Sequence, residues 1–528
     1  MRASAMIVAR LGARTMLMSA ELDKMRAFVL VAVAAALLLF VFLNVVKSLR
    51  RRSSGKLPPS PPSLPLVGHL HLIGPLTHRS LHQLHLRHGA GGGLLLLQLG
   101  RRRTLVVSTA AAAADVYRNH DLAFASRPRN LAADKQLYGG GNVSFAPYGE
   151  LWRRAKKVAV VHLLSPRRAV SFAPVRAAEA AAMVARAARA AGSGEAVELR
   201  ELLYGYTNAV VTRAATGAAG ATADRLKRLL GHSATLVAGL QADDVLPAAA
   251  ARLVRRAAGV ERKIDAMVGE WDRFLSEIVA EHKEKSSGED DFLDVLLRLR
   301  EEEGADGLEL TDNVIKSTVK DMIAAATETT SVTLEWAMAE IVGNPRVMAK
   351  LQDEIARVAG STASPTEAEL GRMGYLRAVV KEVLRLHPPA PLLLPHESTA
   401  AVVLQGGYEI PAKTALFVNV WAIGRDPAAW DEPEEFWPER FVAGGGSAVD
   451  FRGTDYQLLP FGAGRRMCPG INFALPVVDL ALASLLHHFD WSLPSGMRPE
   501  DLDMAEAPGL TTPRRAPLVL IPRRKTLS

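Results

Sequence analysis

The residue best suited to chemistry is Cys468, the single cysteine in a chain of 528 residues. One cysteine cannot form an internal disulfide or a multi-cysteine metal site, so it can be a buried filler, a nucleophile or a lone thiolate ligand to a metal. It stands in "FGAGRRMCPG" (461–470), just before an apolar helix predicted over 471–489. Because nearby cations and the amides of a helix N-terminus stabilise a thiolate, this setting favours the ligand.

Two further patterns combine charge with spacing. Glu382 and Arg385 are three residues apart in "KEVLRLHPP", which places an acid and a base on one face of a helix. Arg440 stands in the segment "FWPERF" (436–441). Each pattern alone can arise by chance in a charged helix or a turn. Their weight comes from their order and spacing relative to the cysteine loop.

The elements that must position these residues are mostly helical. The segment 310–345 predicts one long helix, with Thr311 or Asp312 as its cap and Asn344-Pro345 at its end. In its centre, three alanines precede a polar cluster at 327–330, whose hydroxyl groups can bend a helix by bonding to its own carbonyls. Apolar runs at 94–100 and 104–108 predict short strands. The expected fold class is therefore mainly α with a smaller β portion.

The net charge of +9 is concentrated at the N-terminus. Residues 1–56 hold ten lysines and arginines against two acids, a net +8, so the other 472 residues are nearly neutral. This distribution gives no support to a nucleic-acid-binding surface on the main body.

A membrane anchor is predicted near the N-terminus. Residues 27–46 are apolar except for Asn44, and about 20 such residues can cross a bilayer. The basic run that follows places the downstream part in the cytosol. The expected organisation is an N-terminal extension of doubtful role (1–24), a transmembrane anchor (25–47), a basic and proline-rich hinge (48–68) and a catalytic domain (69–528).

Together these motifs resemble the cytochrome P-450 monooxygenases, a haem-thiolate family, and in particular its plant microsomal members. The stretch 461–470 is similar to the family's haem-binding loop at each fixed position, and the resemblance covers about residues 57–524. It implies the P-450 fold, haem b as cofactor and Cys468 as the axial thiolate of the iron. It also implies that Arg440 joins Glu382 and Arg385 in a structural ion network.

The resemblance implies further contacts with the haem. Arg466, His396 and Trp152 are expected at a haem propionate, and Lys156 replaces the arginine that the family usually has four residues after this tryptophan. A surface histidine is the alternative for His396. The fixed loop positions Phe461 and Gly470 complete the expected cofactor-binding set.

On the long helix, Glu328 and Thr329 match the family's acid and alcohol positions, which deliver protons through water during dioxygen cleavage. The family glycine is Ala326 here, and a structural helix with solvated threonines is the alternative. By position, small or apolar residues are expected near the substrate: Val143, Ser144, Ala325, Leu392, Leu393 and Leu510.

The implied activity inserts one oxygen atom into a lipophilic small molecule of plant specialised metabolism, such as an indole, phenylpropanoid or terpenoid compound. The sequence contains no dinucleotide or flavin motif, so electrons are expected from a partner protein. The resemblance implies that this partner is the NADPH-dependent flavoprotein reductase of the endoplasmic reticulum membrane. A basic patch for that partner is expected at Arg153, Arg154, Lys157 and Arg465. Two alternatives remain: a reductase-independent isomerase or dehydratase, and a non-catalytic haem-binding membrane protein.

Overall fold

The computed structural model describes residues 56–525, apart from gaps at 90–91, 140, 238–242, 244–245, 247, 285–290, 303–308, 361–363 and 443–448. The predicted extension and transmembrane anchor lie outside the described residues. Within them, one helix is long and apolar enough to cross a membrane, Ile471–His488, but two thirds of it is buried inside the body.

Helices make up most of the chain, which confirms the predicted fold class. The first half contains α2 (Thr77–His88), α3 (Ala110–Asn119), α4 (Leu131–Gln136), α5 (Glu150–Val158), α6 (Pro166–Ser171), α7 (Ala173–Ser193), α8 (Leu199–Thr216), α9 (Ala221–Val237) and α11 (Ala248–Ala257). The second half contains α12 (Val260–Glu284), α13 (Phe292–Glu301), α14 (Asp312–Gly343), α15 (Pro345–Ala359), α16 (Glu367–Leu370), α17 (Gly374–Leu386), α18 (Val420–Ile423) and α19 (Ile471–His488).

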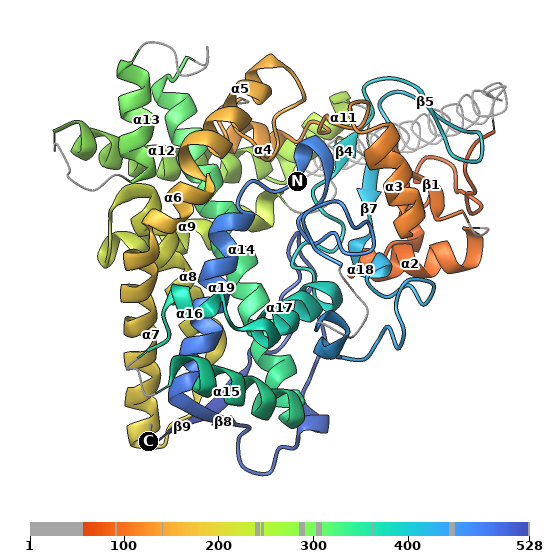
Figure 1. The fold of residues 1–528 in the computed structure, drawn as a ribbon. Coiled ribbons are helices and arrows are strands. Elements are labelled where there is room, and N and C mark those ends of the chain that lie inside the picture. The colour runs from red at the N-terminus through yellow and green to blue at the C-terminus, as the bar shows by residue number, and fades with distance from the viewer. Residues whose placement is uncertain are drawn as a thin grey trace, which may run out of the picture.

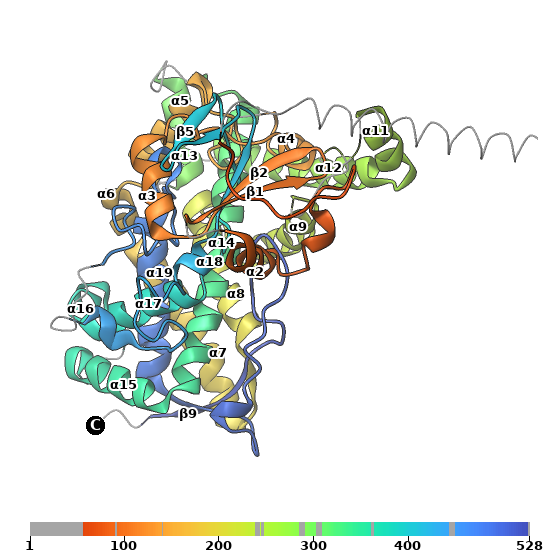
Figure 2. The same ribbon diagram turned by 90° about the vertical axis from the view of Figure 1, so that its right-hand side faces the viewer.

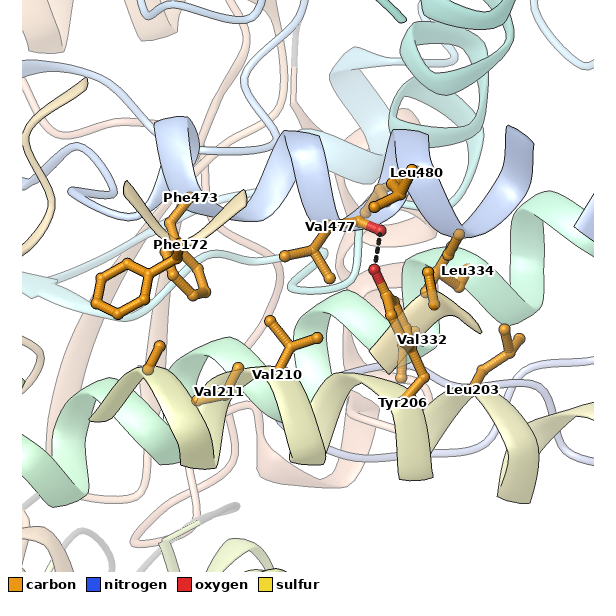
Figure 3. Close-up of a cluster of buried hydrophobic side chains, with 14 of the residues drawn as sticks. Phe172, Leu203, Tyr206, Val210, Val211, Val332, Leu334, Phe473, Val477 and Leu480 are labelled. Atoms are coloured by element: carbon orange, nitrogen blue, oxygen red, sulfur yellow. Dashed lines mark hydrogen bonds between the residues drawn. The ribbon is translucent and has the colours of Figure 1, made fainter. Parts of the chain in front are cut away.

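Helices α14 and α19 run side by side through the middle of the molecule, with α8 against α14 (Figure 1). The side chain of Thr311 caps α14, and Asn344 ends it, with Pro345 opening α15, as predicted. Apolar side chains of the three helices interdigitate, and the buried Tyr206 hydroxyl donates to the Val477 carbonyl at 3.1 Å (Figure 3). The longest predicted helix is therefore the centre of the core.

The β portion forms three small sheets. A four-stranded sheet has the order β1 (Leu94–Leu99), β2 (Arg102–Val107), β7 (Ala415–Val418), β4 (His396–Glu397). The others are β3 (Val197–Glu198), β9 (Val519–Arg524), β8 (Phe489–Ser492), and the pair β5 (Val402–Leu404), β6 (Tyr408–Ile410). In both ribbon views β1 and β2 lie towards the upper end of the molecule and β9 at the lower end (Figures 1 and 2).

The described part of the predicted hinge, residues 56–68, is attached to the four-stranded sheet. The Leu96 amide donates to the Pro59 carbonyl at 2.8 Å, and Gly68 forms a bridge with Leu99. A ring nitrogen of the buried His69 lies 2.8 Å from the Pro61 carbonyl. Its prolines give an extended chain, and residues 56–68 lie as a strap along the body. The boundary at 68/69 stays a prediction.

Candidate active site

The loop around Cys468 is held in a closed shape by its own backbone. The Cys468 amide donates to the Phe461 carbonyl at 2.9 Å, and a short 3₁₀ turn, Gly464–Arg466, lies between them. Gly464 has φ +65°, and a β-carbon there would lie 2.2 Å from Oδ1 of Asp121. Because Asp121 also accepts from the Arg465 amide at 3.1 Å, this position requires glycine.

The Cys468 thiol points to metal binding more than to nucleophilic chemistry. The side chain is half-buried, directly before the N-terminus of α19. Burial raises the pKa of the thiol, and the Gly470 amide and the Lys156 charge only partly oppose this effect. A reactive nucleophile needs a depressed pKa, whereas a bound metal ion deprotonates a coordinating thiol by itself.

Three buried or half-buried cations lie on the same side of the molecule as the cysteine loop. Burial lowers the pKa of Arg466 to about 8, that of Lys156 to about 8 and that of Arg127 to about 10. Among the described residues, the carboxylate that faces Arg127 and Lys156 is Asp321, whose own pKa is raised by burial. This group of Arg127, Lys156 and Arg466 is called the cation cluster below.

The side chains of the cation cluster donate hydrogen bonds to backbone carbonyls. Arg466 donates to the carbonyls of Ala125 at 2.6 Å, Ala146 at 2.6 Å and Val143 at 3.2 Å, and it stacks on the ring of Trp152. Trp152 Nε1 donates to the Val143 carbonyl at 3.0 Å. The sequence predicts that Arg466 and Trp152 bind a haem propionate. In this structure, backbone carbonyls accept the hydrogen bonds that these two side chains donate.

Lys156 Nζ likewise donates to the Met467 carbonyl at 2.6 Å, next to Cys468. His396 is 4% exposed and its Nδ1 lies 2.8 Å from the Phe124 carbonyl, so the alternative of a surface histidine is wrong. Burial, with Arg127 and Arg466 nearby, places the pKa of His396 well below its usual value, so the ring is neutral.

These residues fit a haem. Three cations against one carboxylate leave a surplus of two positive charges when all are ionised, and haem b carries two propionates. The Tyr117 hydroxyl, whose ring contacts His396, is buried and has no hydrogen-bond partner among the residues that the structure describes. An anionic, hydrogen-bonding group beside a thiol would satisfy both the charge and this orphan hydroxyl.

Helix α14 has one accessible window. From Ser317 to Val342 its residues are buried, except for 324–326 and 328–329, and Ala325 is exposed although it lies mid-helix. The flanking turns are buried, so accessible residues in the middle of this helix are confined to the window. It contains the predicted acid and alcohol positions.

The hydroxyl groups of the window bond within the helix. Thr329 Oγ1 donates to the Ala325 carbonyl at 2.6 Å, and the buried Thr327 donates to the Ile323 carbonyl at 2.8 Å. Glu328 instead bonds outside the helix, where its Oε1 accepts from the Thr511 hydroxyl at 2.6 Å. The expected bonding of hydroxyls to the helix's own carbonyls is therefore present, and only Thr329 and Glu328 of the polar cluster reach the window.

Glu382, Arg385 and Arg440 form a compact buried network. Two nitrogens of Arg385 donate to Glu382 at 2.7 and 2.8 Å, and Arg440 Nε donates to it at 3.1 Å. The Trp437 amide adds a further bond at 2.8 Å. Both side chains of the Glu382–Arg385 pair are 0% exposed. The network joins α17 to the segment 436–441 and lies within the core.

The predicted substrate residues divide into two groups. The Val143 and Ser144 amides bond to Asp321 of α14 at 2.9 and 3.0 Å, and Leu510 precedes Thr511, so these residues lie next to the helix that carries the window. Leu393 lies 3.5 Å from the position that a β-carbon on Gly462 of the cysteine loop would occupy. Leu392, in contrast, packs against the cluster of α2, β1 and β2.

Sequence reasoning missed three residues of this region, Arg127, Asp321 and Thr511. Arg127 donates to the carbonyls of Ser144 at 3.0 Å and Leu394 at 2.7 Å, which joins two loops of the site. The available signal for Arg127 was an arginine in the apolar stretch "AFASRP". No feature of the sequence around Thr511 indicates its role, because its partner Glu328 is 183 residues away.

Comparisons with known proteins agree with this geometry. The family profile "Cytochrome P450" matches residues 58–520. Cytochrome P450 71A1 of Persea americana is 42% identical, covering 87% of this chain and 91% of that protein. Salviol synthase of Salvia pomifera and (+)-menthofuran synthase of Mentha piperita are each 40% identical, over 92% of this chain and 96% and 99% of their own lengths.

A solved zebrafish cytochrome P450 structure with abiraterone has a TM-score of 0.70 and 25% identity, covering 85% of this chain and all but 1% of its own. The range that the family profile matches includes the cysteine loop, the window and the ion network. The chain thus belongs to the cytochrome P450 family of haem-thiolate monooxygenases.

Proposed function

We propose that this monooxygenase hydroxylates a lipophilic small molecule of plant specialised metabolism, using electrons from NADPH that arrive through a membrane-bound flavoprotein reductase. The observation that supports this proposal most is the α14 window. It presents three alanines beside one acid and one threonine, inside an otherwise buried helix. Such a surface combines apolar contact for a substrate with groups that can hold or pass a proton.

When bound, the haem supplies the activation of dioxygen, and a cysteine thiolate ligand favours O–O cleavage by donating electron density. Cys468 would hold the iron. Arg127, Lys156, Arg466 and the neutral His396 would hold the propionates, with Trp152 packed under Arg466. Phe461 orients Cys468 by accepting from its amide, and the Gly470 amide donates to the sulfur.

Glu328 and Thr329 are proposed as the groups that hold and move protons. The Thr329 hydroxyl donates to the Ala325 carbonyl, so its oxygen is left to accept a hydrogen bond from water. Glu328 can exchange a proton with water in the window. Ala326 replaces the family's glycine, and the helix still leaves this turn accessible with the methyl group present.

The substrate assignment rests on the apolar residues of the window and its neighbours, Ala325, Val143 and Leu510, with Ser144 as a polar neighbour. Leu393 is a candidate on the side of the cysteine loop. Leu392 is a weaker candidate because it packs on the sheet side. Two relatives bear names that describe the synthesis of salviol and (+)-menthofuran. These names support a small organic substrate for this chain but do not identify which compound it is.

The reductase is proposed to dock beside the cysteine loop. Arg153 and Lys157 are exposed on α5, but Arg154 pairs with Glu150, and Arg465 pairs with Asp121 at 2.5 Å. The predicted basic patch is therefore partly neutralised. The proposed location remains the endoplasmic reticulum membrane, single-pass, with the catalytic domain in the cytosol.

The test is turnover by the purified protein with reductase, NADPH and a library of lipophilic plant compounds, followed by mass spectrometry. We expect a product that gains one oxygen atom and labels from ¹⁸O₂. A product that forms without oxygen or reductase would instead support an isomerase or dehydratase. The absence of NADPH-dependent oxygen consumption with every compound would support a non-catalytic haem protein.

Thr329→Ala tests the proton role. We expect haem loading to persist while product per NADPH falls by about 10²–10⁴-fold, with hydrogen peroxide released in its place. Thr318→Ala is the matched control, since Thr318 makes the same bond to a carbonyl, 2.8 Å to Val314, on a buried turn of α14 outside the window. Equal product yields in both variants would reduce Thr329 to a structural residue.

A further inference from the structure

We infer that Thr511 is a positioning residue for the proton-transfer carboxylate of Glu328. This inference rests on the proposed role of Glu328. The Thr511 hydroxyl donates to Glu328 Oε1 at 2.6 Å across 183 residues of sequence. A hydrogen bond to a carboxylate is stronger than one between neutral groups, so it holds the side chain in one orientation at the edge of the window.

The contrast with the neighbouring hydroxyls shows why Glu328 needs an external partner. Thr327, Thr329 and Thr333 donate to carbonyls one turn earlier in α14, at 2.8, 2.6 and 2.9 Å. Their hydrogen atoms are therefore engaged inside the helix. A glutamate cannot donate such a bond when ionised, and its long side chain has several rotamers. Thr511 supplies the donor that selects one of them.

The loop that carries Thr511, residues 505–515, is itself well anchored. The Ala507 amide donates to the Pro513 carbonyl at 2.8 Å, and the Arg515 amide donates to the Ala505 carbonyl at 2.7 Å. The next residue, Thr512, ties the loop to α14 because its carbonyl accepts from Trp336 Nε1 at 2.9 Å. A rigid donor on a rigid loop can fix the carboxylate to within the tolerance that proton transfer requires.

Helix α8 packs against α14 on another side of the helix bundle. The Glu328 charge adds to burial in raising the pKa of Tyr204 on α8, so this phenol is electrostatically coupled to the carboxylate. Tyr204 also contacts Lys227, whose Nζ lies 5.5 Å from its ring, and Lys227 pairs with the exposed Glu201.

The inference predicts a specific loss in the electron balance. Oxygen reduction to hydrogen peroxide consumes one NADPH per dioxygen, whereas reduction to water consumes two and needs further proton delivery. We expect Thr511→Val to lower the rate of water formation roughly tenfold, in line with the loss of a hydrogen bond to a charged group. This balance is measured with the haem-loaded chain, reductase and NADPH alone, so no substrate is required.

Infrared spectroscopy gives a second readout that does not depend on turnover. The carboxylate bands that vanish in Glu328→Gln belong to Glu328, and we expect them to shift in Thr511→Val and to return in Thr511→Ser. Thr511→Ala replaces the valine variant if that protein fails to load haem. Thr512→Val is the matched control, because the contacts that anchor Thr512 are made by its backbone.

Three results would contradict the inference or the proposed role on which it rests. Unshifted Glu328 bands in Thr511→Val, with altered electron balance in Glu328→Gln, would overturn the positioning role and leave the proton role intact. An unchanged electron balance in Glu328→Gln would overturn the proton role itself. The same shift and the same loss in Thr512→Val would show a general disturbance of the loop and would also overturn the inference.

Discussion

Two buried charged regions of this protein contain similar residues but differ in how their cations are paired with carboxylates. In the ion network, Glu382 lies between Arg385 and Arg440, and the remaining arginine nitrogens donate to carbonyls such as Gly424 and Pro433. In the cation cluster, none of the three cations forms a salt bridge with a carboxylate among the described residues, and burial lowers the pKa of each cation.

The difference separates a structural site from a ligand site. A buried cation costs less free energy when it pairs directly with a carboxylate, as both arginines of the network do with Glu382, than when it has no such partner. The cation cluster maintains that cost next to a thiol with a raised pKa. A cofactor with two carboxylates and a metal ion would pair with the buried cations and bind the thiol as a thiolate. Haem binding should therefore stabilise this region and leave the network unchanged.

The largest effect should come from breaking the network. Glu382→Gln leaves two buried arginines without their counter-charge, so we expect a loss of about 3–5 kcal/mol in the free energy of unfolding. Glu439→Gln is the control from the same region, because its partners Arg346 and Lys350 are exposed and such pairs contribute at most about 1 kcal/mol. Chemical denaturation followed by circular dichroism compares them. Equal losses would contradict the distinction.

A substitution in the cation cluster should weaken haem binding and cause a smaller loss of stability. Arg466→Leu removes a propionate-binding cation, so haem should dissociate about 10–100-fold more readily. The haem-free protein should lose far less stability than it does in Glu382→Gln, because the change also removes a desolvated charge. Haem transfer to apomyoglobin and denaturation of the apoprotein measure the two quantities. Unchanged haem retention would contradict the assignment of Arg466.

The smallest effect concerns Asp479 on α19, a half-buried acid outside both regions, whose pKa is raised to about 7 by burial while Arg377 opposes the shift. The folded state keeps a proton that the unfolded state releases near pH 4, so stability falls as the pH rises from about 4 to 7. The full shift would correspond to about 4 kcal/mol, but hydration of the half-buried carboxyl reduces this. Asp479→Asn should therefore be more stable than the wild type by on the order of 1–2 kcal/mol at pH 8 and nearly equal at pH 4. Thermal unfolding at both pH values checks this. A difference that is independent of pH would contradict it.

Much of the fold could be predicted from local sequence. The boundaries of α14 follow from Thr311 and Pro345, and α19 begins directly after Gly470, because caps, proline and glycine act over a few residues. The short strands β1 and β2 follow from their apolar runs. The resemblance of the cysteine loop then gave the family, which the comparisons confirm.

The rest depended on contacts between distant segments. Nothing near Thr511 in the sequence indicates Glu328, and nothing near Arg127 indicates that it bonds to the carbonyls of Leu394 and Pro395. The prolines of the strap indicate an extended chain because proline removes donors, but they do not indicate that the Pro59 carbonyl accepts from Leu96 of the sheet. Burial in the folded chain decides these roles, and one sequence does not show it.

The central claim is that Cys468 is the thiolate ligand of a haem whose propionates complete the cation cluster. The most direct measurement is the absorption spectrum of the reduced, carbon-monoxide-treated protein, compared between the wild type and Cys468→Ala. We expect the long-wavelength band typical of thiolate ligation in the wild type and its complete loss in the variant. The same band in Cys468→Ala would contradict the account.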